Sequence, residues 1–297
     1  MMTGEARFRG SNTALITPFK GDDLDKAAFK KLVSWQISEG TEGLIPVGTT
    51  GESPTLSHDE HKTVVEMCID EAAGRVNIIA GAGSNSTAEA IDFARHAEAA
   101  GADAVLVVSP YYNKPPQSGL IRHFSMVADA VSVPVIVYDI PGRSVVSVND
   151  DTLAELAKHE NIIGIKDATA DVGRPTRLQN LIGTGFSQLS GEDATALPYL
   201  AAGGHGCISV TCNIAPKLLA EMHAAWASGN VARAMEINQM LEPLHDAMFC
   251  EASPGPVKYA AKLLGLCDDG LRAPLGEIAE SSKRKVEAGL RHAGLWS

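Results

Sequence analysis

Short apolar runs rich in β-branched residues recur along the chain, and a longer segment of helical character follows each of them. The starts of these runs are roughly 20 to 33 residues apart, which is the room that one helix and two loops require. Near-continuous apolar strands are typical of a parallel sheet that is covered by helices. The pattern predicts eight strands: Thr13–Thr17, Gly43–Val47, Val76–Ala80, Ala104–Val108, Val135–Asp139, Ile162–Lys166, Phe186–Leu189 and Gly206–Val210.

Eight strands that alternate with helices favour an α/β fold of the closed (β/α)8 TIM-barrel type over an open doubly wound sheet. An open sheet would usually carry a glycine fingerprint after its first strand, and the residues that follow Thr17 do not form one. One helix start is marked by Ser57 and Glu60, which have the spacing of a capping box. We therefore predict a catalytic barrel over residues 1–228 and a small C-terminal helical appendage over residues 229–297.

Composition agrees with this fold and removes several classes of function. The 297 residues suffice for one barrel of roughly 250 residues and a short extra segment, and the 45% of hydrophobic residues include few aromatics. A net charge of −11 argues against a nucleic-acid-binding protein, because binding phosphates requires cations. The five cysteines form no CxxC pair, and neither a signal peptide nor a membrane-spanning apolar run is evident. These features predict a cytoplasmic protein.

Lys166 is the most informative candidate for chemistry. Catalytic groups of such barrels come from the carboxyl ends of the strands, and Lys166 ends the apolar run that begins at Ile162. Lysine is rarely buried unless it is paired or functional. Loss of hydration and nearby hydroxyls can lower its pKa and give a neutral amine that attacks a ketone as a Schiff-base nucleophile. The alternative is a lysine that extends its ammonium to the mouth of the barrel.

Hydroxyl groups and one guanidinium follow the other predicted strands. Tyr138 ends a neighbouring strand, where it could shuttle protons with help from Thr49 and Tyr112, or could be a core tyrosine whose face depends on register. Arg143 follows in the next loop, as a surface charge or as the bidentate partner of a substrate carboxylate. No cluster of histidines and carboxylates is arranged for a metal.

Five segments in one order carry a family resemblance. They are GTTGE at 48–52, SPYYNKP at 109–115, VYDIPGRS at 137–144, GIKDAT at 164–169 and SGEDATA at 190–196. Together they resemble the dihydrodipicolinate synthase family, which belongs to the N-acetylneuraminate lyase superfamily of class I pyruvate aldolases. The resemblance extends from Gly10 to about Leu266, and several motifs in register make it specific.

The resemblance implies a condensation of pyruvate with L-aspartate 4-semialdehyde, as the first step towards diaminopimelate and lysine. Lys166 would form the imine with pyruvate, which serves as the electron sink, so that no metal or organic cofactor is needed. Tyr138, Thr49 and Tyr112 would be the proton relay, with Tyr112 shared across a tight dimer interface. The family resemblance further implies a homotetramer built from two such dimers.

The resemblance also implies residues that bind substrate. Thr50 would hold the pyruvate carboxylate, Arg143 would bind the carboxylate of the semialdehyde, and Gly191 and Ile208 would line the pocket.

Sister activities fit the sequence less well. N-acetylneuraminate lyases typically have Ser-Thr at positions 49–50 and lack Arg143, and 2-keto-3-deoxy-sugar-acid aldolases lack the combination of Tyr112 with Arg143. A barrel that had become a non-catalytic scaffold would be expected to lose Lys166, Tyr138 or Arg143, and all three are present.

Two positions depart from the family pattern. Gly142, which precedes Arg143, stands where a bulkier residue is common. Asp139 stands where the family commonly has Asn. A carboxylate near Lys166 would favour the charged amine, whereas a carboxylate paired with another neighbour would not.

A second site is implied by the resemblance alone. The sequence HDEH at 58–61 lacks the HExxH spacing of a zinc site, and its histidines could simply be solvated residues of a helix start. Relatives in bacteria and plants bind L-lysine there as a feedback inhibitor. The matching positions are Ser53, His58, His61, Asn85, Glu89 and Tyr111.

Overall fold

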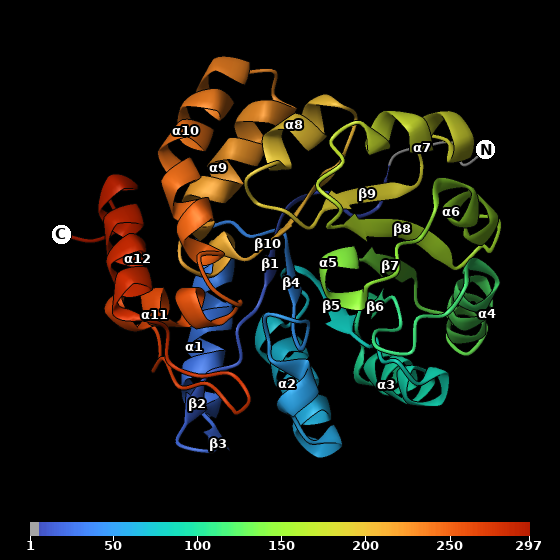
Figure 1. The fold of residues 1–297 in the computed structure, drawn as a ribbon, viewed down its shortest axis with the longest axis horizontal. Helices are drawn as coiled ribbons and strands as arrows, with labels where there is room; N and C mark the ends of the chain where they lie inside the picture. Colours follow the sequence, from blue (N-terminus) through green and yellow to red (C-terminus); the bar gives the residue numbers. More distant parts are fainter. Residues whose placement is uncertain (1–5) are drawn as a thin grey trace. The chain divides into compact units, whose positions relative to one another are not determined.

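The computed structural model describes residues 6–297, whose main sheet is a closed barrel of eight parallel strands in the order β1-β10-β9-β8-β7-β6-β5-β4 (Figure 1). The barrel confirms the predicted (β/α)8 fold. Its strands are β1 (Gly10–Ala14), β4 (Gly43–Ile45), β5 (Asn77–Gly81), β6 (Ala104–Val108), β7 (Val135–Asp139), β8 (Ile162–Asp167), β9 (Ser187–Ser190) and β10 (Gly206–Ser209).

The chain divides into two compact units, residues 1–10 with 78–208 and residues 11–77 with 209–297. In the first unit, β5 to β9 are almost wholly buried, as strands covered on both faces must be. Figure 1 shows the longer helices of this unit outside these strands, with α3 against β6 and α4 against β7. Its helices are α3 (Thr87–Ala100), α4 (Gln117–Ala128), α5 (Pro141–Ser144), α6 (Asp150–Leu156), α7 (Arg174–Ile182) and α8 (Ala196–Ala201).

The second unit contains most of β1, all of β4 and the C-terminal helices. Here α10 packs against α9 and α12, and α11 packs against α12 (Figure 1). The predicted boundary at residues 228 and 229 falls in the turn between α9 and α10, and the two-part division remains a prediction. The further elements are β2 (Phe19–Lys20), β3 (Asp23–Leu24), α1 (Lys26–Ser38), η1 (Ser53–Thr55), α2 (His58–Ala72), η2 (Thr211–Asn213), α9 (Pro216–Ala227), α10 (Val231–Met248), α11 (Gly255–Leu263) and α12 (Glu280–His292).

The first strand lies three residues earlier than the sequence predicts. The apolar run Thr13–Thr17 is buried throughout, but only its first two residues belong to β1. Beyond β1, the N–H of Ile16 donates to Asn213 Oδ1 at 3.0 Å, and the Thr17 hydroxyl donates to the Gly51 carbonyl at 2.7 Å. The Asn213 side chain therefore satisfies a backbone N–H of Ile16 that a strand would satisfy in its ladder.

Local signals place the helix that follows the Thr49–Thr50 loop. Helix α2 begins after Ser57, whose hydroxyl accepts from the N–H of Glu60 while the Glu60 carboxylate accepts from the N–H of Ser57. The predicted capping box is confirmed. Over residues 6–297 no helix combines the length and apolar character that crossing a membrane would take.

Candidate active site

Lys166 and Tyr138 lie side by side near the carboxyl ends of β8 and β7. The two residues are paired in the strand register, and each residue is about 5% exposed. The Lys166 Nζ lies 4.3 Å from the centroid of the Tyr138 ring. A lysine in this place is neither extended to solvent nor part of an apolar core, and its amine sits against a phenol that can exchange protons.

Gly191 makes room for the lysine side chain at the end of β9. A methyl group at Gly191 would lie 3.1 Å from Lys166 Cε and 2.9 Å from Ala168 Cβ, both closer than ordinary van der Waals contact. The N–H of Gly191 donates to the Asp167 carbonyl at 2.7 Å, which fixes the glycine beside β8. The predicted pocket residue Gly191 therefore borders the lysine.

Glu192 is a half-buried carboxyl that the sequence pattern does not single out. Burial raises its pKa, the neighbouring Asp193 raises it further, and the positive charge of Lys166 opposes both effects. A carboxyl group that responds electrostatically to Lys166 belongs to the surroundings of the amine. The segment SGEDATA contained it, but an acidic residue in a loop carries no signal that separates it from solvated ones.

Asp139 does not face Lys166. Because side chains alternate along a strand, Tyr138 and Lys166 point to one face, and Asp139 and Asp167 point to the other. Arg174 Nη1 lies 2.9 Å from Asp139 Oδ2, so the carboxylate is paired with a guanidinium. The Asp139 carboxylate is therefore paired with a neighbour other than Lys166.

The loop that carries Thr49 and Thr50 follows β4 in the second unit. Thr50 is buried and Thr49 is partly exposed. Glu52 ends the loop in the left-handed region, with φ of +56°, and is buried. Both charged groups of the ion pair between Glu52 and Lys258 are fully buried, with Lys258 Nζ 2.5 Å from Glu52 Oε1.

The C-terminal part of the second unit surrounds this ion pair. Lys258 Nζ also donates to the Gly270 carbonyl at 2.7 Å and lies 4.1 Å from the centroid of the Phe19 ring. The Arg272 guanidinium lies 4.5 Å from the same ring, and the Arg272 N–H donates to Glu52 Oε2 at 3.1 Å. Helix α11 and the segment after it thus hold the end of the threonine loop.

The remaining predicted substrate and relay residues differ in exposure. Arg143 is exposed and lies in the one-turn helix α5, where the sequence predicts a loop. Tyr112 is 88% exposed and adopts a φ of +73°, which is rare for a residue with a side chain. Ile208 is fully buried in β10.

Three of the predicted regulatory residues gather in the first unit. Burial raises the pKa of Tyr111, the charge of Glu89 adds to this, and a hydrogen bond from the Asn85 backbone opposes it. The Ser84 hydroxyl donates to Glu89, an interaction that the sequence reasoning did not include. In the second unit, Ser53 lies in η1, His58 is exposed at the start of α2, and His61 is buried one turn later.

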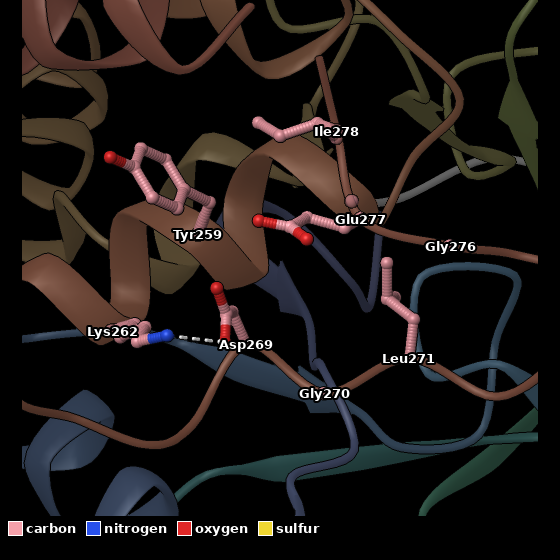
Figure 2. Close-up of a pocket in the computed structure, with 9 residues that line it drawn as sticks. Tyr259, Lys262, Asp269, Gly270, Leu271, Gly276, Glu277 and Ile278 are labelled. Atoms are coloured by element: carbon pink, nitrogen blue, oxygen red, sulfur yellow. Dashed lines mark hydrogen bonds and ion pairs between the residues drawn. The ribbon is translucent and has the colours of Figure 1, made fainter. Parts of the chain in front are cut away.

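A separate pocket of about 260 Å³ lies among the C-terminal residues of the second unit (Figure 2). Lys262 and Asp269 form an ion pair of 2.8 Å at its wall, and Tyr259 donates to Glu287 at 2.9 Å. None of the predicted site residues lines it. The residues that do are Gly255, Tyr259, Lys262, Asp269, Gly270, Leu271, Gly276, Glu277 and Ile278.

Comparisons with known proteins match almost the whole chain. The family model for the dihydrodipicolinate synthetase family matches residues 7–293. The 4-hydroxy-tetrahydrodipicolinate synthase of Bradyrhizobium diazoefficiens is 57% identical over 294 residues, which cover 99% of each chain. The protein of the same name from Afipia carboxidovorans is 58% identical, also over 294 residues and 99% of each chain.

Solved structures are similar over the same extent. The dihydrodipicolinate synthase of Acinetobacter baumannii, solved in complex with pyruvate, is 43% identical, has a TM-score of 0.94, and matches over 97% of this chain and 99% of that one. The enzyme from Cyanidioschyzon merolae, solved with lysine bound, is 35% identical, has a TM-score of 0.95, and matches over 98% of this chain and 100% of that one.

Proposed function

The chain belongs to the dihydrodipicolinate synthetase family, and on that premise we propose that it is a 4-hydroxy-tetrahydrodipicolinate synthase that works through an imine on Lys166. Its substrates would be pyruvate and L-aspartate 4-semialdehyde. The observation that carries the proposal is the buried amine of Lys166 at the end of β8, 4.3 Å from the Tyr138 ring centroid. The Acinetobacter relative, whose structure contains pyruvate, supports the choice of keto acid.

The proposed chemistry begins at the lysine nitrogen. After loss of a proton, the Nζ of Lys166 adds to C2 of pyruvate, and loss of water leaves the imine. Removal of a proton from C3 gives an enamine, whose carbon forms a bond to the aldehyde carbon of the second substrate. The amino group of that substrate then attacks the imine carbon, which closes the ring and releases Lys166.

Protons must be moved at each of these steps. We assign this to Tyr138, which lies against the amine, with Thr49 and Tyr112 completing a hydroxyl relay. The proposal takes Tyr112 from a second subunit of a homotetramer. Its 88% exposure in the single chain is what a side chain that completes a partner's site would have.

The carboxylates of the two substrates require hydrogen-bond donors from the protein. Thr50 is assigned to the pyruvate carboxylate, and Arg143 is assigned to the carboxylate of the semialdehyde, which its guanidinium can bind through two hydrogen bonds. Gly191 and Ile208 are assigned to the pocket wall, and the closeness of Gly191 to Lys166 supports its place there.

We also propose that L-lysine binds this protein as a regulator. The Cyanidioschyzon relative was solved with lysine bound. The carboxylate of Glu89 would bind the ammonium of the ligand beside Tyr111 and Asn85, and Ser53, His58 and His61 complete the proposed set. We place the reaction in the cytoplasm, where the five cysteines would remain the free thiols that they are in the structure.

Borohydride reduction in the presence of pyruvate tests the proposal. We expect a stable adduct that peptide mapping assigns to Lys166, with Lys258 as the internal control because it is another buried lysine. A Lys166→Arg variant should give no adduct. An unmodified wild-type protein would refute the imine, and an adduct without turnover of L-aspartate 4-semialdehyde would indicate a different pyruvate aldolase.

A further inference from the structure

A buried charged cluster lies on the outer face of β7 and β8, directly behind the proposed active site. Tyr138 and Lys166 are followed by Asp139 and Asp167, which are paired in the same register. The side chains of the two aspartates are 0% and 1% exposed. Each carboxylate is therefore one peptide bond away from a residue of the proposed chemistry, but on the opposite face of the strands.

Arg174, near the start of α7, is the cation of this cluster. Its Nη1 lies 2.9 Å from Asp139 Oδ2 and 3.5 Å from Asp167 Oδ1, and its Nε lies 2.8 Å from Asp150 Oδ1. Its Nη2 donates to the carbonyl oxygen of Val148. With a side chain only 4% exposed, one guanidinium holds two strands, α6 and the segment before α6.

The charges make this arrangement specific to arginine. Two buried carboxylates repel each other and lose their hydration, so they require a cation between them. Burial raises the pKa of Asp139, whereas the hydrogen bond and charge of Arg174 oppose that rise, as does the Ser147 hydroxyl. A lysine ammonium could neutralise one carboxylate, but its three donors could not reach all four partners with the geometry of a planar guanidinium.

Main-chain hydrogen bonds link the cluster to the lysine. The Asp139 carbonyl accepts from the N–H of Ala168 at 2.9 Å, and the Asp167 carbonyl accepts from the N–H of Gly191 at 2.7 Å. Because Gly191 borders Lys166, a shift of one strand end would change the position of the amine relative to the groups around it.

We propose that Arg174 is a positioning residue, which clamps the ends of β7 and β8 through Asp139 and Asp167 and thereby holds the Lys166 amine over the Tyr138 ring. This inference rests on the proposed imine chemistry at Lys166. It concerns a residue that touches neither substrate, so its effect is on the rate at which the amine reacts and not on how well pyruvate binds.

The test compares Arg174→Lys with Arg177→Lys. Arg177 is an exposed arginine one turn further along the same helix, and it pairs with Asp150 and Asp171. The measurement is the rate of imine formation at increasing pyruvate concentrations, followed by borohydride trapping and mass spectrometry. For Arg174→Lys we expect the maximal rate to fall about tenfold or more, since small misplacements of a reacting group are costly. The pyruvate concentration at half-maximal rate should change less than about twofold, and Arg177→Lys should resemble wild type.

A second pair of variants guards against a failure of Arg174→Lys to fold. Asp139→Asn keeps a side-chain oxygen that can accept a hydrogen bond from Arg174, whereas Asp139→Ala removes this acceptor. We expect the rate to stay within about twofold of wild type for Asn and to fall about fivefold or more for Ala. Equal rates in all folded variants, with losses only of thermal stability, would overturn the positioning role, whereas absence of any adduct in the wild type would instead overturn the imine at Lys166.

Discussion

Gly191 shows how a residue without a side chain can serve the proposed lysine chemistry. A methyl group there would lie 3.1 Å from Lys166 Cε, 2.9 Å from Ala168 Cβ and 3.3 Å from Ala168 Cα, so the lysine side chain would have to move. We expect Gly191→Ala to displace the lysine and to slow imine formation about tenfold or more, because a shift of less than 1 Å disturbs reacting geometry. Timed borohydride trapping with pyruvate measures this rate.

The matched control is Gly276→Ala, because a methyl group at Gly276 meets nothing within 4 Å. We expect that variant to react as fast as the wild type. If Gly191→Ala reacted at the wild-type rate while remaining folded, the lysine would have to be mobile enough to accommodate the methyl group, and the assigned wall would be wrong.

His123 offers a test of stability against pH. It is 4% exposed in α4, its Nδ1 lies 2.9 Å from the Thr87 hydroxyl, and burial lowers its pKa from 6.5 to about 4. The unfolded chain therefore binds a proton on this residue as the pH falls below 6.5, while the folded chain does not until about pH 4. Folding stability should decrease across this window, by on the order of 3 kcal/mol in total from His123.

Urea unfolding at a series of pH values measures this dependence. His123→Gln should flatten the slope between pH 6.5 and pH 4, and His292→Gln, which changes an exposed histidine, should leave it as it is. An unchanged slope in His123→Gln would mean that the ring is protonated within the folded protein.

At the scale of single residues, the sequence indicates a functional group where that group breaks a pattern. Lys166 ends an apolar run with a charged side chain, and the structure buries it against Tyr138. Arg174 and Lys258 interrupt no such run, because polar residues are ordinary in helices, and only the folded chain brings each of them to a buried carboxylate. Each of these ion pairs joins residues that are more than thirty positions apart, and the local sequence around one residue does not indicate such a partner.

At the scale of elements, the ion pair between Lys258 of α11 and Glu52 should be essential to the loop that carries Thr49 and Thr50. Lys258→Met would leave a fully buried carboxylate without its cation, which we expect to lower the free energy of unfolding by roughly 3 to 5 kcal/mol. Lys262→Met, one turn further along the same helix, removes a pair whose lysine is 51% exposed and should cost far less stability, because water screens an exposed pair. Chemical denaturation of both variants measures the difference.

The double variant Glu52→Gln with Lys258→Met separates the charge from the packing. If the unpaired carboxylate causes the loss, the double variant should recover part of the stability that Lys258→Met loses. Equal losses in Lys258→Met and Lys262→Met would show that water reaches Glu52 and that the C-terminal residues do not hold the loop.

Elements were predictable where side-chain pattern and backbone bonding agree. Helix α2 begins where the capping box indicates, and β7 has the predicted bounds Val135–Asp139. The first strand was misplaced because Leu15 and Ile16 are as buried as strand residues, while Ile16 gives its N–H to Asn213, nearly two hundred residues away. An apolar run predicts that its residues are buried, but it does not predict which group accepts from each backbone N–H.

At the scale of the whole molecule, the closed barrel follows from the count and spacing of apolar runs, because eight alternating units have few other ways to bury them. The proposed homotetramer does not follow from such a pattern. A contact between subunits uses surface residues whose types also suit solvent, and only the motif that contains Tyr112 suggests one. Tyr112 is 88% exposed and has a φ of +73°, and contact with a second subunit would account for both features.

Mixing two inactive variants tests whether Tyr112 serves the site of a neighbouring subunit. In a mixed dimer of Lys166→Ala and Tyr112→Phe subunits, the Tyr112→Phe subunit keeps its own Lys166 and receives an intact Tyr112 from its partner. One complete site is therefore formed, and we expect co-refolded subunits to condense pyruvate with L-aspartate 4-semialdehyde faster than either variant alone, up to about a quarter of the wild-type rate for random pairing in equal amounts. If Tyr112 acted within its own subunit, every site in the mixture would lack either the lysine or the tyrosine, and mixing would give only the average of the two variants. Sedimentation of the mixture shows whether dimers have formed. An average rate from assembled dimers would contradict the shared relay. Lys166 would then use only hydroxyl groups of its own chain.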